Sequence, residues 1–151
     1  LAAIHKLNDA GIKCCVLTKG ILPIELAECS KDNEYGITLI SLDDDYRLKM
    51  EPGSAPYQDR LNALRALHNQ GFYTWVSIEP YPTPNLINQS INPILKAVEF
   101  VDKIIFGRTN YSKEITAYTK HKDFYKEQAI EVIAFCKARN IAYHIKNGTI
   151  T

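Results

Sequence analysis

Polar residues that could bind a small charged ligand follow each of five apolar segments in this sequence. These residues are Thr18 and Lys19, Ser41 and Asp43, Ser77 and Glu79, Arg108 with Asn110 and Tyr111, and finally Lys146 and Asn147. The ammonium group of Lys19 could bind a carboxylate, and Glu79 or Asp43 could bind an ammonium group. Serine and asparagine side chains could bond the hydroxyls of a ribose. Together these residue types suit a zwitterionic ligand.

A simpler explanation exists for any single one of these residues, because strands also become polar where they stop at water. The set as a whole favours a binding site, since parallel β/α proteins bind their ligands at the carboxyl ends of the strands. We therefore treat Lys19, Ser41, Ser77 and Glu79 as candidate ligand-binding residues.

Other chemistry finds less support in the sequence. The run Asp43-Asp44-Asp45 is a weak metal motif, because consecutive side chains rarely point the same way and helix capping accounts for acids there. No Gly-x-Gly-x-x-Gly, Walker or Gly-x-Ser-x-Gly motif occurs. The segment 111–126 interleaves tyrosines with lysines, which could stack on bases, but acidic residues interrupt it and favour a solvated face. We predict no metal ligands.

The hydrophobic pattern predicts alternating helices and strands. Helices are expected at residues 1–10, 23–29, 56–70, 92–100 and 121–139, and strands at 12–17, 37–42, 73–78, 103–106 and 141–145. Residues 43–55 are expected to form a loop with a possible helical turn, where Arg47 and Glu51 could form a surface ion pair. A loop this long is also typical of a functional segment.

No connection between these strands is short enough for a hairpin, so the strands should be parallel. The sequence thus predicts one α/β domain over residues 1–151, in which five strands form a parallel β/α arc. Five strands cannot close an eight-stranded barrel, and an arc leaves an unpaired edge. We therefore expect the C-terminal part of an incomplete TIM barrel.

Composition is ordinary for a globular chain. Of 151 residues 46% are hydrophobic and 23% charged, with a net charge of +1 that draws the chain to neither nucleic acid nor membranes. There is no signal-peptide pattern and no apolar run approaching the roughly 20 residues of a membrane span, so we expect a cytoplasmic protein. The first residue is Leu1 rather than methionine, which suggests a processed protein or the remainder of a longer one.

The cysteines have no spacing typical of a metal site. They are Cys14, Cys15, Cys29 and Cys136, and none forms a Cys-x-x-Cys motif. Cys14 and Cys15 are neighbours on an expected strand and should therefore point to opposite faces. We expect buried, reduced thiols.

Several motifs between residues 10 and 112 resemble a known superfamily. They are Val16-Leu17-Thr18-Lys19, Thr38-Leu39-Ile40-Ser41-Leu42-Asp43, Leu48-Lys49-Met50-Glu51-Pro52-Gly53, Arg60-Leu61-Asn62-Ala63-Leu64 and Trp75-Val76-Ser77-Ile78-Glu79-Pro80. In letters and spacing they are similar to the radical S-adenosylmethionine (SAM) superfamily, in the branch of spore photoproduct lyase and related DNA repair photolyase-like proteins.

The resemblance implies an incomplete TIM barrel that holds SAM and a [4Fe–4S] cluster, whose reductive cleavage of SAM yields a 5′-deoxyadenosyl radical. It places Lys19 and Ser41 at the amino-acid moiety of SAM, and Ser77 and Glu79 at SAM or substrate. The further candidates for a substrate wall are Asp43, Arg108, Asn110 and Tyr111. The substrate is not implied, although nucleic acid is possible.

The cluster-binding pattern of the superfamily, Cys-x3-Cys-x2-Cys, is absent from this chain. We therefore expect the cluster ligands to lie upstream of Leu1, and the chain to be an inactive C-terminal part of a longer radical SAM enzyme. The alternative is a stand-alone β/α module that binds a small ligand at the same edge without catalysis.

Overall fold

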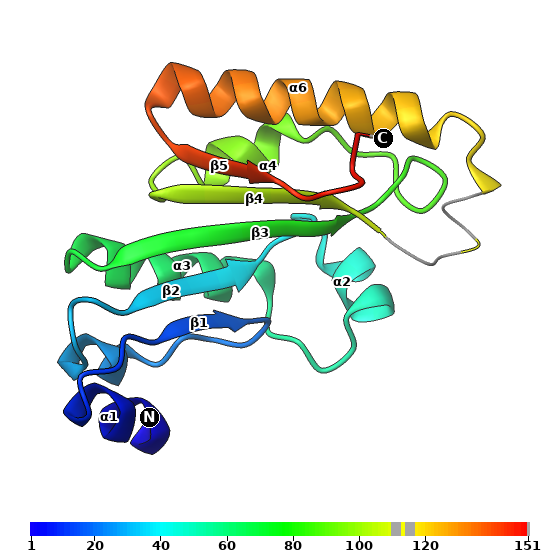
Figure 1. Ribbon diagram of the computed structural model, residues 1–151. Helices are drawn as coiled ribbons and strands as arrows, with labels where there is room; N and C mark the ends of the chain where they lie inside the picture. Colours follow the sequence, from blue (N-terminus) through cyan, green and yellow to red (C-terminus); the bar gives the residue numbers. More distant parts are fainter. Residues whose placement is uncertain (110–112, 114–116, 151) are drawn as a thin grey trace.

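A computed structural model describes residues 1–109, 113 and 117–150. Its centre is a five-stranded sheet in which every neighbouring pair is parallel and the strand order follows the sequence. The strands are β1 (Cys15–Thr18), β2 (Glu34–Thr38), β3 (Tyr73–Tyr81), β4 (Lys103–Arg108) and β5 (Ala142–Ile145). Their carboxyl ends share one edge of the sheet, at the right of Figure 1. The predicted parallel β/α arc is confirmed.

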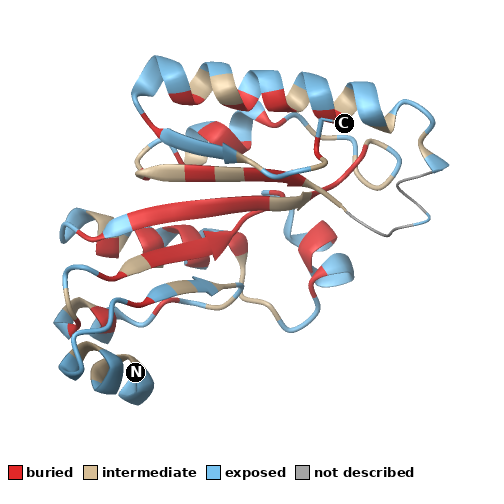
Figure 2. Cartoon of the chain, viewed as in Figure 1, coloured by how far each residue is buried: buried red, intermediate tan, exposed pale blue. Residues whose placement is uncertain are grey.

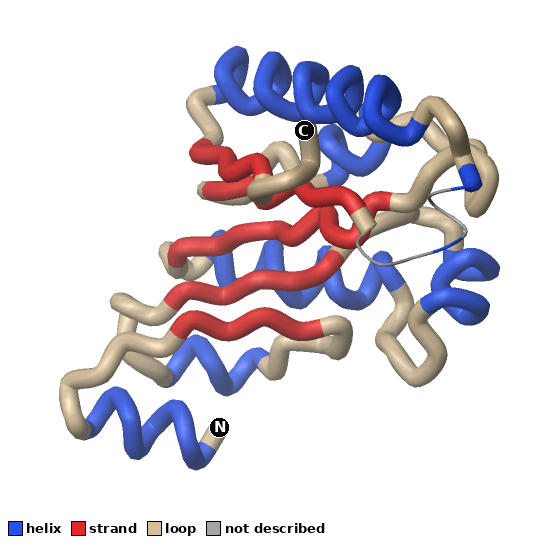
Figure 3. The backbone as a smooth tube through the Cα atoms, turned by 45° about the vertical axis from the view of Figure 1, so that its right-hand side comes forward, coloured by secondary structure: helices blue, strands red, loops and turns tan. Residues whose placement is uncertain are grey.

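One helix precedes β1, the others lie in the connections between strands, and α3, α4 and α6 cover one face of the sheet. They are α1 (Ala2–Asp9), the 3₁₀ helix η1 (Ile24–Glu28), α2 (Asp44–Met50), α3 (Tyr57–Asn69), α4 (Asn92–Ala97) and α6 (His121–Arg139). α3 packs on β2 and β3, while α6 packs on β4 and β5. Figure 1 shows α3 and α4 behind the sheet, and Figure 3 shows the same layering from another angle.

The hydrophobic core fills the space between the sheet and these helices. Ile37, Val76, Ile104 and Phe106 point from the strands into this layer and are fully buried. Leucine side chains face them from α3, where Leu64 is also fully buried. Figure 2 shows the buried residues gathered on the central strands and on the sheet-facing sides of the helices.

The opposite face of the sheet is crossed by no helix in the described part of the chain (Figure 1). Leu17 of β1 lies on this open face and is 49% exposed, while Trp75 of β3 lies flat against Gly36 of the neighbouring strand. Successive strand side chains alternate between faces, so Ser77 shares the open face with Trp75. The face therefore carries both apolar and polar side chains.

Three sequence predictions need correction. The second strand was expected at 37–42 but is Glu34–Thr38. Leu39 and Ile40 are buried although they lie beyond this strand, and an apolar run cannot distinguish a buried connection from a strand. The loop expected at 43–55 contains the complete helix α2, and the helix expected at 23–29 is only the 3₁₀ helix η1.

The cysteine prediction holds for three of the four thiols. Cys14, Cys29 and Cys136 are buried, but Cys15 is exposed because it lies on the open face of β1. Cys14 and Cys15 do differ in burial as expected for strand neighbours. No helix in the described ranges is long and apolar enough to cross a membrane.

Candidate functional site

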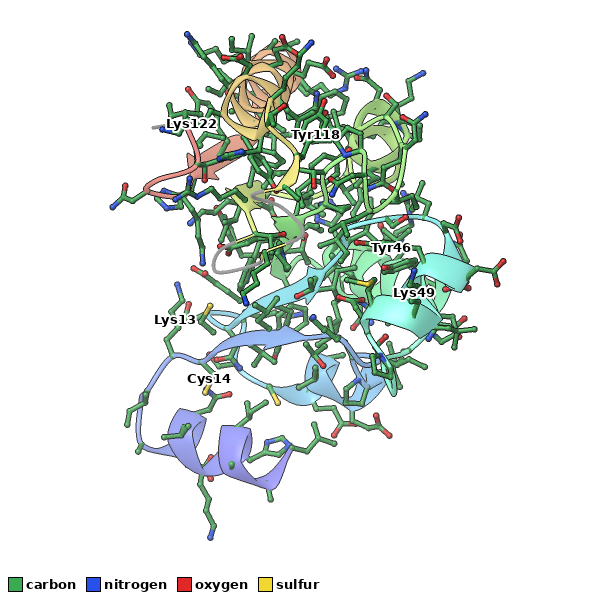
Figure 4. All side chains as sticks on the ribbon, turned by 90° about the vertical axis from the view of Figure 1, so that its right-hand side faces the viewer. Lys13, Cys14, Tyr46, Lys49, Tyr118 and Lys122 are labelled. Atoms are coloured by element: carbon green, nitrogen blue, oxygen red, sulfur yellow. The ribbon has the colours of Figure 1, made fainter. Side chains whose placement is uncertain are left out.

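A cavity of about 410 Å³ lies at the carboxyl edge of the sheet. Its walls come from the ends of four strands, from α2 and from the loop after β3. The lining residues are Lys19, Ile40, Tyr46, Lys49, Met50, Glu51, Pro80, Asn85, Leu86 and Thr109. Figure 4 views the molecule from this edge, with Tyr46 and Lys49 labelled on α2. The cavity is thus mainly apolar and carries a few charged groups, as ligand sites usually do.

Helix α2 is positioned at the cavity by its first residues. The Asp43 carboxylate accepts hydrogen bonds from the backbone amides of Asp45 and Tyr46, at 2.9 and 3.0 Å, and so caps the helix. This confirms that the acidic run serves as a helix cap. The cap fixes the direction in which α2 presents Tyr46 and Lys49 to the cavity.

Lys19 forms a cluster of three charges with two buried residues, Glu51 and Arg60. The Lys19 ammonium lies 2.9 Å from Oε1 of Glu51, and Oε2 of Glu51 lies 3.0 Å from a guanidinium nitrogen of Arg60. The side chains of Glu51 and Arg60 are 2% and 0% exposed, whereas that of Lys19 is 47% exposed. Lys19 is therefore the only member of the cluster that a ligand could reach.

Arg60 is held by further contacts within the fold. Its guanidinium donates hydrogen bonds to the carbonyl oxygens of Ala55 and Thr38, at 2.8 and 2.9 Å, and packs against the ring of Tyr57. The carbonyl of Lys19 accepts a bond from the amide of Ala55 at 2.9 Å. The end of β1, the end of β2 and the start of α3 are thus joined around Glu51.

The cavity lining carries a net positive charge. Lys19 and Lys49 contribute two positive charges and Glu51 one negative charge, and Arg60 neutralises that carboxylate from below. An anionic group is therefore favoured near the two lysines, with an apolar part of the ligand against Tyr46, Met50 and Leu86.

Two tyrosines of this region have perturbed acidity. Burial, and then the negative charge of Glu51, raise the pKa of Tyr46 to about 12. The same two causes raise the pKa of Tyr57 well above its usual range. Both phenols are therefore neutral near neutral pH, and they add no charge to the cavity.

Ser41 and Asp43 border a second, shallower hollow rather than the cavity. The hydroxyl of Ser41 donates a 2.7 Å hydrogen bond to Oε1 of Gln89, and the amide of Gln89 bonds the carbonyl of Ile40. This hollow measures about 430 Å³ and lies between the end of β2, the loop after β3 and α4. The Ser41 side chain thus links the loop after β3 to the end of β2.

Ser77 and Glu79 lie on the open face of the sheet. Ser77 is 5% exposed within β3. The Glu79 carboxylate packs closely over Gly107 and lies 2.6 Å from the ammonium group of Lys146 beyond β5. Of the four candidate residues Lys19, Ser41, Ser77 and Glu79, only Lys19 borders the cavity, while Ser41 borders the second hollow and Ser77 and Glu79 lie on the open face.

Of the remaining candidates for the substrate wall, the structure describes only Arg108. Arg108 ends β4, opposite Tyr81 of β3, and is half-buried. Asn110 and Tyr111 lie outside the described residues.

Sequence reasoning missed the partners of Lys19. Glu51 was expected to pair with Arg47 on the surface, but Arg47 is itself buried and pairs with Asp44 and the carbonyl of Ser54. The sequence analysis named Arg60 only within the motif at residues 60–64 and predicted no role for it. The signal that could have found the cluster is the presence of Arg60 on the apolar side of α3, where an arginine requires a buried partner.

The chain's own residues do not fit an iron–sulfur cluster. Cys14 and Cys15 lie at β1, Cys29 follows η1 and Cys136 lies in α6. Within the described ranges, no three histidine, cysteine, aspartate or glutamate side chains come together as a metal site. The cavity, by contrast, combines apolar walls with the positive charges of Lys19 and Lys49.

The chain shares its fold with solved structures of SuiB from Streptococcus suis. The match to SuiB has a TM-score of 0.68 at 16% identity, and that to SuiB bound to the precursor peptide SuiA has 0.67 at 18%. The match to SuiB bound to S-adenosylmethionine has 0.68 at 12%. Each covers 97% of this chain and only 34% or 35% of the SuiB chain. No protein-family model and no curated protein sequence matches the chain.

Proposed function

We propose that this chain is part of a radical SAM enzyme, in which it supplies part of the SAM pocket and part of the substrate wall. The observation that carries the proposal is the cationic cavity at the carboxyl edge of a sheet whose fold is shared with SAM-bound SuiB. Three of the motifs that resemble the radical SAM superfamily, at residues 16–19, 38–43 and 75–80, lie at the carboxyl ends of β1, β2 and β3 on this same edge. Because the chain spans about a third of the length of SuiB, the complete enzyme would be longer.

The residues of this chain fit one end of SAM. Lys19 would bind the SAM carboxylate. Ser41, Ser77 and Glu79 are proposed for its other polar groups; they lie outside the cavity, so the part of the pocket that they would line extends beyond it. Asp43, Arg108, Asn110 and Tyr111 would belong to the substrate wall. Bound SAM supplies the source of a carbon radical in this superfamily, and the residues here would hold and orient it in a partly apolar cavity.

The [4Fe–4S] cluster would be bound by residues outside this chain, since the four cysteines lie apart. The chain by itself would therefore be inactive. Within the superfamily we propose the branch of spore photoproduct lyase, with a lyase-type reaction. The substrate is not assigned, and nucleic acid is one candidate.

The test is iron and sulfide analysis of the full-length protein after anaerobic reconstitution, followed by an assay for reductive SAM cleavage. We expect about four iron and four sulfide per protein, as a [4Fe–4S] cluster requires, and cleavage that depends on the cluster. The 151-residue chain serves as the control and should bind no cluster. A full-length protein that binds neither cluster nor SAM would refute the proposal.

A second candidate function is a binding module without catalysis. It is favoured by one observation, namely that this chain lines the cavity from four strand ends, from α2 and from the loop after β3. Calorimetric titration of the isolated chain with SAM distinguishes the two functions. Tight binding by the chain alone, combined with no cluster in the full-length protein, would favour the module.

A further inference from the structure

We propose that Glu51 is a positioning residue that holds the Lys19 ammonium at the cavity, ready for the carboxylate of the bound ligand. The inference rests on the proposed function, because it takes SAM as the ligand. It assigns a role to a buried carboxylate for which the sequence suggested only a surface ion pair with Arg47. Arg60 is the second part of this arrangement.

The Lys19 side chain could adopt several conformations, and its contact with Glu51 restricts them. Its side chain borders the cavity on one side and, on the other, a hollow of about 390 Å³ formed with Gly20 and residues 51–54. A lysine side chain is flexible and could extend into either space. Glu51 borders both spaces as well, and the contact of 2.9 Å to its buried carboxylate holds the Lys19 ammonium where they meet.

Arg60 makes this arrangement compatible with anion binding. A Lys19–Glu51 pair alone would be neutral, and its carboxylate would repel an anionic ligand. Because Arg60 lies 3.0 Å from the other oxygen of Glu51, the three groups carry a net charge of +1. That charge is accessible only at Lys19, since Glu51 and Arg60 are buried.

Stability alone gives little reason for such a cluster. Burying an ion pair costs solvation that its attraction often fails to offset, and apolar residues of similar size are frequently as stable. The buried Glu51–Arg60 pair is therefore better explained by what it does for the one exposed member. The effect of the cluster's charge and the effect of the Lys19 position on ligand binding can be measured separately.

The experiment compares two ligands on the full-length protein. SAM and decarboxylated SAM differ in the carboxylate that Lys19 would bind, so the ratio of their dissociation constants reports on that contact. We expect Lys19→Met to weaken SAM binding by about tenfold or more, the scale of one charge-assisted hydrogen bond, and to leave decarboxylated SAM nearly unchanged.

The variant Glu51→Gln distinguishes an effect of charge from an effect of position, because the two predict opposite changes in the preference for SAM over decarboxylated SAM. The substitution removes a negative charge and releases Lys19. If charge alone governed binding, the preference for SAM over decarboxylated SAM would rise, because only SAM carries a carboxylate and decarboxylated SAM has the larger positive charge. If position governs it, SAM should bind about tenfold more weakly while decarboxylated SAM changes little. General damage to the fold would weaken both ligands equally.

Glu51→Asp provides a second variant if the glutamine variant does not fold, as judged by circular dichroism. It keeps the negative charge near Arg60 but withdraws the carboxylate from Lys19 by one methylene, so it should lower the SAM preference in the same direction. An unchanged or increased SAM preference in the folded variants would overturn the positioning role. If the unaltered protein binds no SAM, the proposed function itself fails.

Discussion

Replacing Gly36 by alanine tests how tightly the open face of the sheet is packed. A Cβ atom added to Gly36 would lie 2.4 Å from Cε2 and 2.6 Å from Cδ2 of the Trp75 ring. Real Cβ atoms do not approach ring carbons so closely, so the ring or the strand must move. The perturbation therefore acts on one defined contact between β2 and β3.

The expected loss follows from the geometry. Trp75 is 8% exposed and its ring is held on a central strand, so it cannot simply swing into water. Introducing a methyl group into such a packed position costs about 1–3 kcal/mol. For a chain of this size each kcal/mol lowers the melting temperature by roughly 2–4 °C.

Urea and thermal unfolding of the isolated chain measure this cost, provided that unfolding is two-state. Gly20→Ala is the matched control, because its added Cβ would meet only the flexible Thr18 hydroxyl, at 3.2 Å. Combining Gly36→Ala with Trp75→Leu removes the clash, so the double variant should lose less than the sum of the two single losses. Additive losses, or a harmless Gly36→Ala, would refute the proposed packing.

The remaining predictions concern buried charge, pH and thiol reactivity. Arg60→Met should cost about 3–5 kcal/mol in urea unfolding, because it removes the buried counter-charge of Glu51 and leaves that carboxylate with the half-exposed Lys19 alone; a loss under 1 kcal/mol would contradict the buried pair. Since burial raises the pKa of Tyr46 from 10 to about 12, the folded state favours the neutral phenol. This contribution is complete below pH 10 and is lost as the pH rises towards 12, so Tyr46→Phe should flatten part of the alkaline decline in unfolding free energy. Cys15 is exposed and should react first with a thiol reagent, in a fast phase that Cys15→Ser abolishes. Cys136, whose pKa burial raises to about 11, should react only on unfolding.

The order of the elements could be read from the sequence because it depends on local patterns. Alternating apolar runs and amphipathic segments, without hairpin-length connections, leave a parallel sheet as the simplest arrangement. The capping role of Asp43 was also local, since its partners are the amides of Asp45 and Tyr46. The polar edge at the strand ends follows from the same parallel direction.

The partners of the edge residues were decided only by tertiary structure. Lys19 meets Glu51 across two different connections of the chain, and Glu79 meets Lys146 from a distant strand end. Ser41 turns away from the cavity because its hydroxyl bonds Gln89. A one-dimensional pattern places residues at the end of a strand, but only packing determines which neighbours a side chain reaches and whether those neighbours are buried.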